Sequence, residues 1–199
     1  MELFSSLEAV RVAVTALVGI AQDYDLDGWL INIENTLPTE CVENVILFLQ
    51  LLTKEMREIR GVHSQVMWYD AVTMEGKLQW QDGLTALNKP FFDACDSIFI
   101  NYTWKEPSLV NTRCLLELDK GNVSRCSDVY YGVDVFGRGT IGGGGYNCCE
   151  ALNLLDGVCE HPDISTLQSY SYSAAVFAPG WLLETQCTEV ESTDCVYSK

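Results

Sequence analysis

Short apolar runs alternate with longer segments of helical periodicity along this chain. Five runs bounded by turn residues are predicted strands: 28–35, 65–70, 97–102, 128–136 and 173–178. Helices are predicted between them, near 42–60, 84–93, 107–119 and 147–156, and a buried helix is predicted over 10–21. The segment 42–60 carries the clearest pattern, with Thr36 as a possible cap, Pro38 in the first turn, and Gly61 after Arg57 and Arg60 as an end signal. The pattern predicts an α/β fold.

The predicted strands recur at a nearly constant interval. They begin at 28, 65, 97, 128 and 173, so the intervals are 37, 32, 31 and 45 residues. A βα unit takes about 30 residues, and eight such units make a (β/α)₈ barrel of about 250 residues. Five units account for this chain. A doubly wound, Rossmann-like sheet gives the same alternation, so the interval leaves both folds open.

Composition and charge narrow the classes of partner. The chain has 199 residues, 48% of them hydrophobic, and a formal net charge of -16. This charge argues against nucleic acid and anionic membranes as partners, and a neutral substrate fits better. No apolar run approaches the roughly 20 residues that span a bilayer. The apolar segment 12–21 lacks the basic residues that precede it in a signal peptide, so we expect a cytosolic protein.

Neither a metal nor a cofactor is expected. The nine cysteines form no C-x-x-C pair, and His63 and His161 are the two histidines, so zinc-ligand spacing is absent. Free thiols in a reducing compartment are the simpler interpretation. A G-x-G-x-x-G run begins at Gly137, but the acidic residues about 20 positions on, Asp156 and Glu160, fall at a predicted helix end. We therefore reject dinucleotide binding and expect a flexible loop over 142–145.

Polar and aromatic side chains gather where the predicted strands end. Alternation places Leu30, Asn32 and Glu34 on one face of their strand. Further candidates at the same end of successive strands, or shortly after it, are Tyr69, Asp70, Trp80, Asn101, Tyr102, Trp104 and Asp134. Active sites of (β/α)₈ barrels lie at the carboxyl ends of the strands. Taken singly, each aromatic residue is more often part of a core and each carboxylate more often lies on the surface. This structural interpretation is weaker for the whole set, because all its members follow successive strands at the same end.

Six runs, in order, resemble one known family. They are YDLDGWLINIEN at 24–35, VMWYD at 66–70, LQW at 78–80, FFDACDSIFINYTW at 91–104, VYYGVDVFGRG at 129–139 and AAVFAPGW at 174–181. Together they resemble glycoside hydrolase family 85, the cytosolic endo-β-N-acetylglucosaminidases. The resemblance implies cleavage between the two core N-acetylglucosamines of N-linked glycans, free oligosaccharides or glycopeptides. It also implies a cytosolic enzyme, with transglycosylation as a competing outcome and no obligate protein partner.

The resemblance also assigns roles to residues. Glu34 is the implied general acid and base, Asn32 orients the substrate's acetamide, and Tyr69 assists at the same group. Trp80 and Trp104 match positions that line the glycan site. Asp70, Asn101 and Asp134 are further candidates for substrate binding. The implied mechanism is substrate-assisted, with an oxazoline-like intermediate, and we expect desolvation at the barrel mouth to raise the pKa of Glu34.

Two alternatives stay open at this point. A conventional carboxylate pair of Glu34 and Asp70 would also cleave a glycoside. The family barrel begins well before Met1, so we expect residues 1–184 to form a partial barrel covering roughly the fourth to eighth strands, followed by a polar tail over 185–199. A five-stranded part-barrel has open edges. A non-catalytic remnant, or a glycan-binding module, is therefore the second functional hypothesis.

Overall fold

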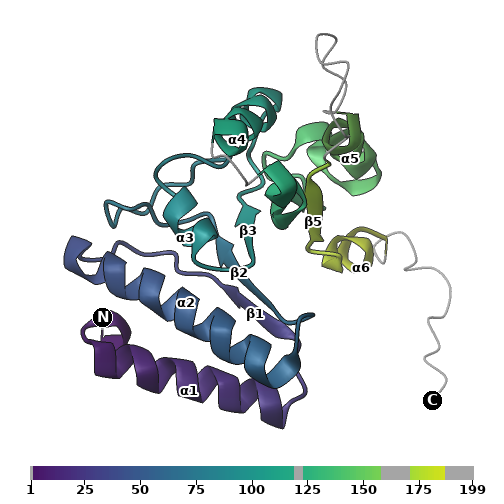
Figure 1. Cartoon of the computed structure of the whole chain (residues 1–199). Coiled ribbons are helices and arrows are strands. Elements are labelled where there is room, and N and C mark those ends of the chain that lie inside the picture. The colour runs from purple at the N-terminus through teal and green to yellow at the C-terminus, as the bar shows by residue number, and fades with distance from the viewer. Residues whose placement is uncertain (1, 119–122, 158–170, 187–199) are drawn as a thin grey trace, which may run out of the picture.

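The computed structural model describes residues 2–118, 123–157 and 171–186 (Figure 1). The strands are β1 (Gly28–Ile31), β2 (Gln65–Tyr69), β3 (Ser97–Ile100), β4 (Val129–Asp134) and β5 (Ser173–Phe177). The helices are α1 (Leu7–Asp23), α2 (Thr39–Arg60), α3 (Lys89–Asp93), α4 (Glu106–Leu118), α5 (Cys148–Gly157) and α6 (Gly180–Gln186). Short 3₁₀ turns span Glu2–Phe4, Val123–Asp128, Ile141–Gly143 and Gly145–Asn147. Residues 187–199 of the predicted tail, with Cys159, Glu160 and His161, lie outside the described residues.

The five strands form one parallel sheet in the order β1-β2-β3-β4-β5. The prediction of parallel neighbours in chain order is confirmed. A Rossmann-like sheet reverses its strand order at a switch point, and the described sheet has no reversal. The doubly wound alternative is therefore wrong. In this arrangement every described strand presents its carboxyl end at the same edge of the sheet.

Strand β1 ends earlier than predicted. It pairs with β2 from Gly28↔Gln65 to Ile31↔Trp68, and the chain leaves the ladder before Asn32. Among the described residues β1 pairs on one side alone, so nothing extends the ladder beyond Ile31. Gly28 is required at the close approach of the two strands, because a Cβ atom there would lie 1.8 Å from the carbonyl oxygen of Gln65.

Helix α2 covers the sheet and α1 packs against α2 (Figure 1). The predicted end of α2 is confirmed, since Gly61 has a φ of 81° and its N–H donates to the carbonyl of Arg57. The predicted cap is wrong: Pro38 occupies the N-cap and the helix begins at Thr39. Helix α1 buries Val10, Val14, Val18 and Ala21, but Val12 is exposed. Within the described ranges, no helix is both long enough and apolar enough to cross a membrane.

The two faces of the sheet differ in burial. Trp68 stacks on Phe91 of α3 with ring centroids 4.6 Å apart, and Tyr131 donates a hydrogen bond to Thr112 of α4. Both strand residues are fully buried. On the opposite face, Leu30 is 49% exposed and lies in register with Met67. The helices therefore cover the face of Trp68, and the face of Leu30 is open.

The glycine-rich loop after β4 is folded against itself rather than extended. A Cβ atom on Gly144 would lie 2.4 Å from the backbone nitrogen of Gly137, and one on Gly145 would lie 2.9 Å from the ring of Trp181. Both glycines have positive φ values, 78° and 56°. The expectation of a flexible loop over 142–145 is therefore replaced by a pair of tight 3₁₀ turns.

Candidate active site

Asn32 and Glu34 lie in the segment that directly follows β1. The side-chain Nδ2 of Asn32 donates to Oε1 of Glu34 at 3.1 Å. The structure thus brings the two side chains together, as alternation along the chain predicts. Both are exposed, because the face of the sheet beside them has no covering wall. The desolvation expected at Glu34 is therefore not present in the described chain.

Tyr69 closes β2 beside this pair. Its hydroxyl donates to Oδ1 of Asn101 at 3.0 Å, and its side chain is largely buried. Burial raises the pKa of Tyr69, and the negative charge of Glu34 raises it further. Ile31 is in register with Trp68, so the segment after β1 that holds Asn32 and Glu34 continues beside Tyr69. Asn32, Glu34 and Tyr69 therefore form one cluster at the carboxyl end of β1 and β2.

Trp80 lies at the edge of this cluster. The chain after β2 forms a small antiparallel bridge between Val72 and Leu78 and then reaches Trp80. The side chain of Trp80 lowers the pKa of Tyr69, against the larger effect of burial, which raises it. Trp80 is 42% exposed, so part of its ring faces solvent beside Tyr69. A ring in this setting has the exposed apolar surface on which a sugar can stack.

Asp70 is turned away from the cluster. Its Oδ2 accepts from the backbone N–H groups of Gln81 and Asp82 at 3.1 and 2.9 Å, and its Oδ1 accepts from Asn88 at 2.8 Å. The side chain is 1% exposed, and burial raises its pKa to about 7 against these hydrogen bonds. The carboxylate of Asp70 therefore organises the loop that carries Trp80, a position that does not support the predicted contact with substrate or the pairing with Glu34.

Asn101 is buried behind Tyr69 rather than exposed to a ligand. Its Nδ2 donates to Oδ1 of Asp82 at 2.8 Å and to Oγ1 of Thr103 at 2.7 Å, while its Oδ1 accepts from Tyr69. The predicted substrate contact is therefore replaced by contacts within the protein. Sequence reasoning missed Asp82 and Thr103. The Asp-Gly dipeptide at 82–83 is a turn signal that would have drawn attention to this loop.

Trp104 belongs to the core. It is 0% exposed, and its indole N–H donates to the carbonyl of Gly132 at 2.8 Å. Its ring meets Tyr131 edge to face at 5.1 Å. The structure packs Trp104 against β4, a position that does not support the expectation that it lines the glycan site.

Asp134 is likewise committed to the protein. Its carboxylate accepts from the Arg138 side chain at 2.7 and 3.0 Å and from the backbone N–H groups of Phe136 and Arg138. Burial alone would raise the pKa of Asp134, but the hydrogen bonds from Arg138 and Phe136 outweigh burial and the pKa is lowered. The side chain is fully buried. Its predicted contact with substrate is therefore replaced by a structural one that fixes the loop after β4.

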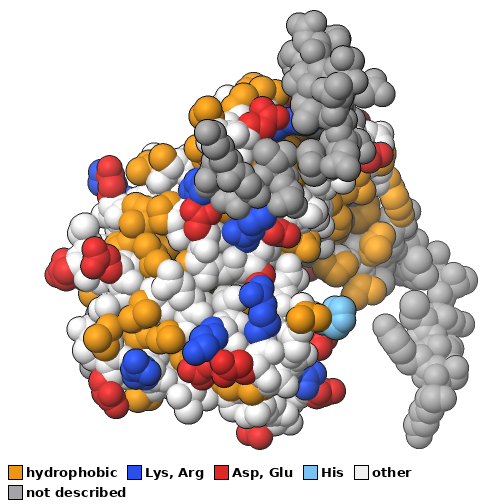
Figure 2. Space-filling model, viewed as in Figure 1, with side chains coloured by type: hydrophobic (Ala, Val, Ile, Leu, Met, Phe, Trp, Pro, Cys, Tyr) orange, Lys and Arg blue, Asp and Glu red, His pale blue; other side chains and the backbone are white. Residues whose placement is uncertain are grey.

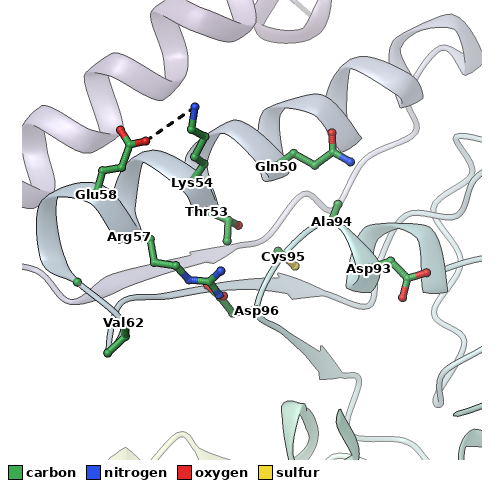
Figure 3. A pocket seen from close by; sticks show the side chains of 11 residues that line it. Gln50, Thr53, Lys54, Arg57, Glu58, Val62, Asp93, Ala94, Cys95 and Asp96 are labelled. Carbon is green, nitrogen blue, oxygen red and sulfur yellow. Dashed lines mark hydrogen bonds and ion pairs between the residues drawn. The ribbon is translucent and has the colours of Figure 1, made fainter. Parts of the chain in front are cut away.

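A hollow of about 600 Å³ lies between α2 and the turn from α3 to β3 (Figure 3). Lys54 and Glu58 form an ion pair at its rim, and Arg57 pairs with Asp96 across it. Val62 and Asp96 precede β2 and β3, so the hollow is at the amino ends of the strands. It is therefore separate from the cluster of Asn32, Glu34 and Tyr69.

Charged side chains and possible metal ligands are spread over the part of the chain that the structure describes. Figure 2 shows several Lys and Arg side chains near the middle of one face, with Asp and Glu side chains beside them. In residues 2–118, 123–157 and 171–186 no group of three or more His, Cys, Asp or Glu side chains is arranged to hold a metal ion. Cys41, Cys95, Cys114, Cys148 and Cys149 in these ranges are free thiols.

Comparisons with solved structures identify the fold. The chain superposes on the glycoside hydrolase domain of Endo-D from Streptococcus pneumoniae R6 with a TM-score of 0.64 and 21% identity, covering 92% of this chain and 27% of that one. A family GH18 chitinase from Chromobacterium violaceum gives a TM-score of 0.57 at 16% identity, covering 89% and 56%. At these identities the likeness is one of fold. The structural neighbours are thus glycoside hydrolases, and this chain shares their α/β architecture.

Sequence comparisons identify the family. The chain is 44% identical over 186 residues to cytosolic endo-beta-N-acetylglucosaminidase 1 of Arabidopsis thaliana, which covers 93% of this chain and 24% of that protein. It is 41% identical over 169 residues to the human cytosolic endo-beta-N-acetylglucosaminidase, covering 84% and 20%. The chain thus spans about a fifth to a quarter of the length of these relatives. The sequence profile of glycosyl hydrolase family 85 matches residues 2–195. This chain therefore belongs to glycosyl hydrolase family 85.

Proposed function

We propose that this chain carries the catalytic residues of a cytosolic endo-β-N-acetylglucosaminidase. The hydrogen bond from Asn32 to Glu34, beside Tyr69, is the observation that carries the proposal. An amide, a carboxylate and a phenol at the carboxyl ends of adjacent parallel strands are the groups needed to handle an acetamide and to move a proton. Relatives that cover most of this chain are named cytosolic endo-beta-N-acetylglucosaminidases, which supports both the activity and the compartment.

The sheet is, in this proposal, part of a (β/α)₈ barrel, with β1 to β5 as roughly its fourth to eighth strands. Two observations support it: the strand order runs without reversal, and the structural neighbours are glycoside hydrolases. In a barrel the open face of Leu30 is the interior and the helix-covered face of Trp68 is the exterior. Asn32, Glu34 and Tyr69 then lie at the mouth, where barrel enzymes have their active sites.

The substrates are N-linked glycans, free oligosaccharides or glycopeptides. The bond that breaks joins the anomeric carbon of one core N-acetylglucosamine to the oxygen of the next. The substrate's own acetamide oxygen attacks this carbon while Glu34 donates its proton to the leaving oxygen. The intermediate is an oxazolinium ion, a protonated oxazoline that keeps the acetamide N–H proton, and Asn32 orients the acetamide that forms it. Glu34, now a carboxylate, takes a proton from the water that opens the oxazoline, or from a sugar hydroxyl when transglycosylation occurs.

The acid-base role is tested by Glu34→Gln in the protein at the full length that its gene encodes. Glutamine keeps the shape and can still accept the hydrogen bond from Asn32, but it has no proton to transfer. Cleavage of an N-linked glycan should fall by about 10² to 10⁴-fold, the usual contribution of general acid-base catalysis. Glu43→Gln, an exposed change on α2, is the matched control and should leave the rate unchanged. Turnover near the wild-type rate in Glu34→Gln would move the role to another group.

The substrate-assisted step is tested by Asn32→Ala. If Asn32 only orients the acetamide, it is needed for formation of the oxazoline and not for the later reaction of the oxazoline with an acceptor. The variant should fail to hydrolyse a glycan and yet transfer sugar from a preformed glycan oxazoline to an N-acetylglucosamine acceptor. A carboxylate nucleophile gives no reason for this split. If both reactions survive, or both vanish in a folded protein, the proposed role of Asn32 is wrong.

The exposure of Asn32 and Glu34 favours a second candidate, a module that binds glycan without cleaving it. An exposed carboxylate lacks the dry setting in which a working acid is tuned. This candidate requires that wild-type protein bind a chitobiose-core glycan in calorimetry and release no product during prolonged incubation. Release of product that depends on Glu34 excludes it.

A further inference from the structure

A chain of hydrogen bonds connects Tyr69 to the carboxylate of Asp82. The phenol donates to Asn101 Oδ1 at 3.0 Å, and Asn101 Nδ2 donates to Asp82 Oδ1 at 2.8 Å. Thr103 adds a second donor to the same Asp82 oxygen at 2.6 Å and accepts from Asn101 at 2.7 Å. Because Asp82 and Thr103 occupy the amide nitrogen of Asn101, its oxygen is the end that faces Tyr69. The carboxylate thus sets the orientation of the amide that holds the phenol.

The backbone at Asp82 is held in an uncommon conformation. Its φ is 53°, in the left-handed region that few residues other than glycine, asparagine and aspartate adopt. Its N–H donates to Asp70, whose second oxygen is bonded to Asn88. Residues in such conformations persist where the surroundings determine them, and they cluster at functional sites. Asp70 therefore holds the backbone of Asp82 while the Asp82 side chain holds Asn101.

We infer that Asp82 is a positioning residue for the reaction at Asn32 and Glu34, acting through Asn101 on the hydroxyl of Tyr69. The inference rests on the proposed function, because the position of Tyr69 matters to a rate only if the reaction takes place there. An error of about 1 Å in a positioned group can cost a factor of about 10² in rate. Without the acceptor at residue 82, Asn101 can rotate and release the phenol. Asp82 then contributes to the rate without touching substrate.

Two substitutions separate the side chain from the backbone. Asp82→Gly and Asp82→Asn both tolerate a φ of 53°, but only asparagine still presents an oxygen to Asn101 and Thr103. We expect kcat to fall about 10- to 100-fold in Asp82→Gly with KM changed less than about threefold. We expect Asp82→Asn to recover kcat to within about threefold of wild type. A merely structural role for the loop backbone would give the two variants equal kcat values.

Asp25→Gly is the matched control. Asp25 also has a positive φ, 57°, but it precedes β1 at the opposite edge of the sheet and pairs with Arg60. Its replacement should leave kcat unchanged. The second measurement combines Asp82→Gly with Tyr69→Phe. If Asp82 acts through the phenol, the double variant should be no slower than Tyr69→Phe alone, because the hydroxyl that Asp82 positions is already absent.

Each outcome decides a different statement. The positioning role is overturned if Asp82→Gly and Asp82→Asn have equal kcat values, or if the losses multiply in the double variant. Either result leaves the proposed glycosidase activity unaffected. A wild-type protein that cleaves no glycan, or a Glu34→Gln variant with full turnover, refutes the proposed function, and the positioning role is then refuted with it. Recovery by asparagine together with non-additive losses supports the inference.

Discussion

Replacing Trp104 by phenylalanine asks whether this indole belongs to the core or to the glycan site. The change removes the N–H group that donates to the carbonyl of Gly132 and keeps an aromatic ring against Tyr131. Because Trp104 is completely buried, water cannot replace the lost donor. The effect should therefore appear in the free energy of unfolding and not in substrate affinity.

The magnitude follows from the contacts. Leaving a buried acceptor without its partner costs about 1–3 kcal/mol. For a protein of about this length, each kcal/mol lowers the melting temperature by about 2–4 °C. Trp104→Phe should thus lower it by about 2–12 °C, without a change in KM. Trp80 is the matched comparison, since it is 42% exposed and lies beside Tyr69.

The assay is urea or thermal unfolding, together with glycan cleavage, on both variants. We expect Trp80→Ala to leave the unfolding free energy within about 0.5 kcal/mol, as surface changes usually do, and to weaken glycan binding or turnover. Trp104→Phe should show the reverse pattern. If Trp104→Phe keeps wild-type stability and raises KM, the ring faces the glycan and its assignment to the core is wrong.

Three further predictions concern the free energy of unfolding. The pKa of Asp70 is about 7 in the folded chain against an ordinary 3.8, so the folded state keeps a proton that the unfolded state releases. Its contribution is fully present below about pH 4, and the unfolding free energy should fall by about 4 kcal/mol as the pH rises to about 7, a slope that Asp70→Asn removes in urea titrations. Gly132→Ala should cost about 1–3 kcal/mol in the same assay, because its Cβ would lie 2.8 Å from the ring of Phe99. Gly19→Ala, which meets nothing within 4 Å in α1, should instead be neutral or stabilising, and equal effects would contradict the packing argument.

Sequence periodicity was sufficient for the sheet but not for the direction of every polar group at its edge. Asp70 directly follows β2, and alternation continued by one residue places it on the face opposite Tyr69. The burial of Asp70 thus follows from the same rule that grouped Asn32 with Glu34. Grouping all polar residues at the strand ends as candidates does not separate Asp70 from Tyr69 by face. Asn101 lies at the predicted end of its strand, but its amide nitrogen donates to Asp82. Asp82 is in a loop, and the sequence of that loop has no hydrophobic periodicity from which its path could be predicted.

The position of Trp104 could not be predicted from periodicity for a different reason. It follows β3 by four residues, after the ladder has ceased to fix the direction of side chains. Burial of a large ring and a hydrogen bond to Gly132 then decide its position. Both depend on packing against β4, which is distant in the sequence. The local sequence pattern therefore predicts strand β3 but does not predict the direction of the Trp104 ring.

Asp70 holds its loop by accepting hydrogen bonds from the main-chain N–H groups of residues 81 and 82 and not from their side chains. Any residue other than proline supplies such a group, so these two hydrogen bonds do not depend on the side chain at position 81. Surface chemistry next to Trp80 can thus diverge during evolution, or be randomised in a library, while the scaffold beneath it is retained. Diversification at Gln79, which is exposed, changes the surface beside Trp80 and leaves the hydrogen bond between Asp70 and Asn88 in place.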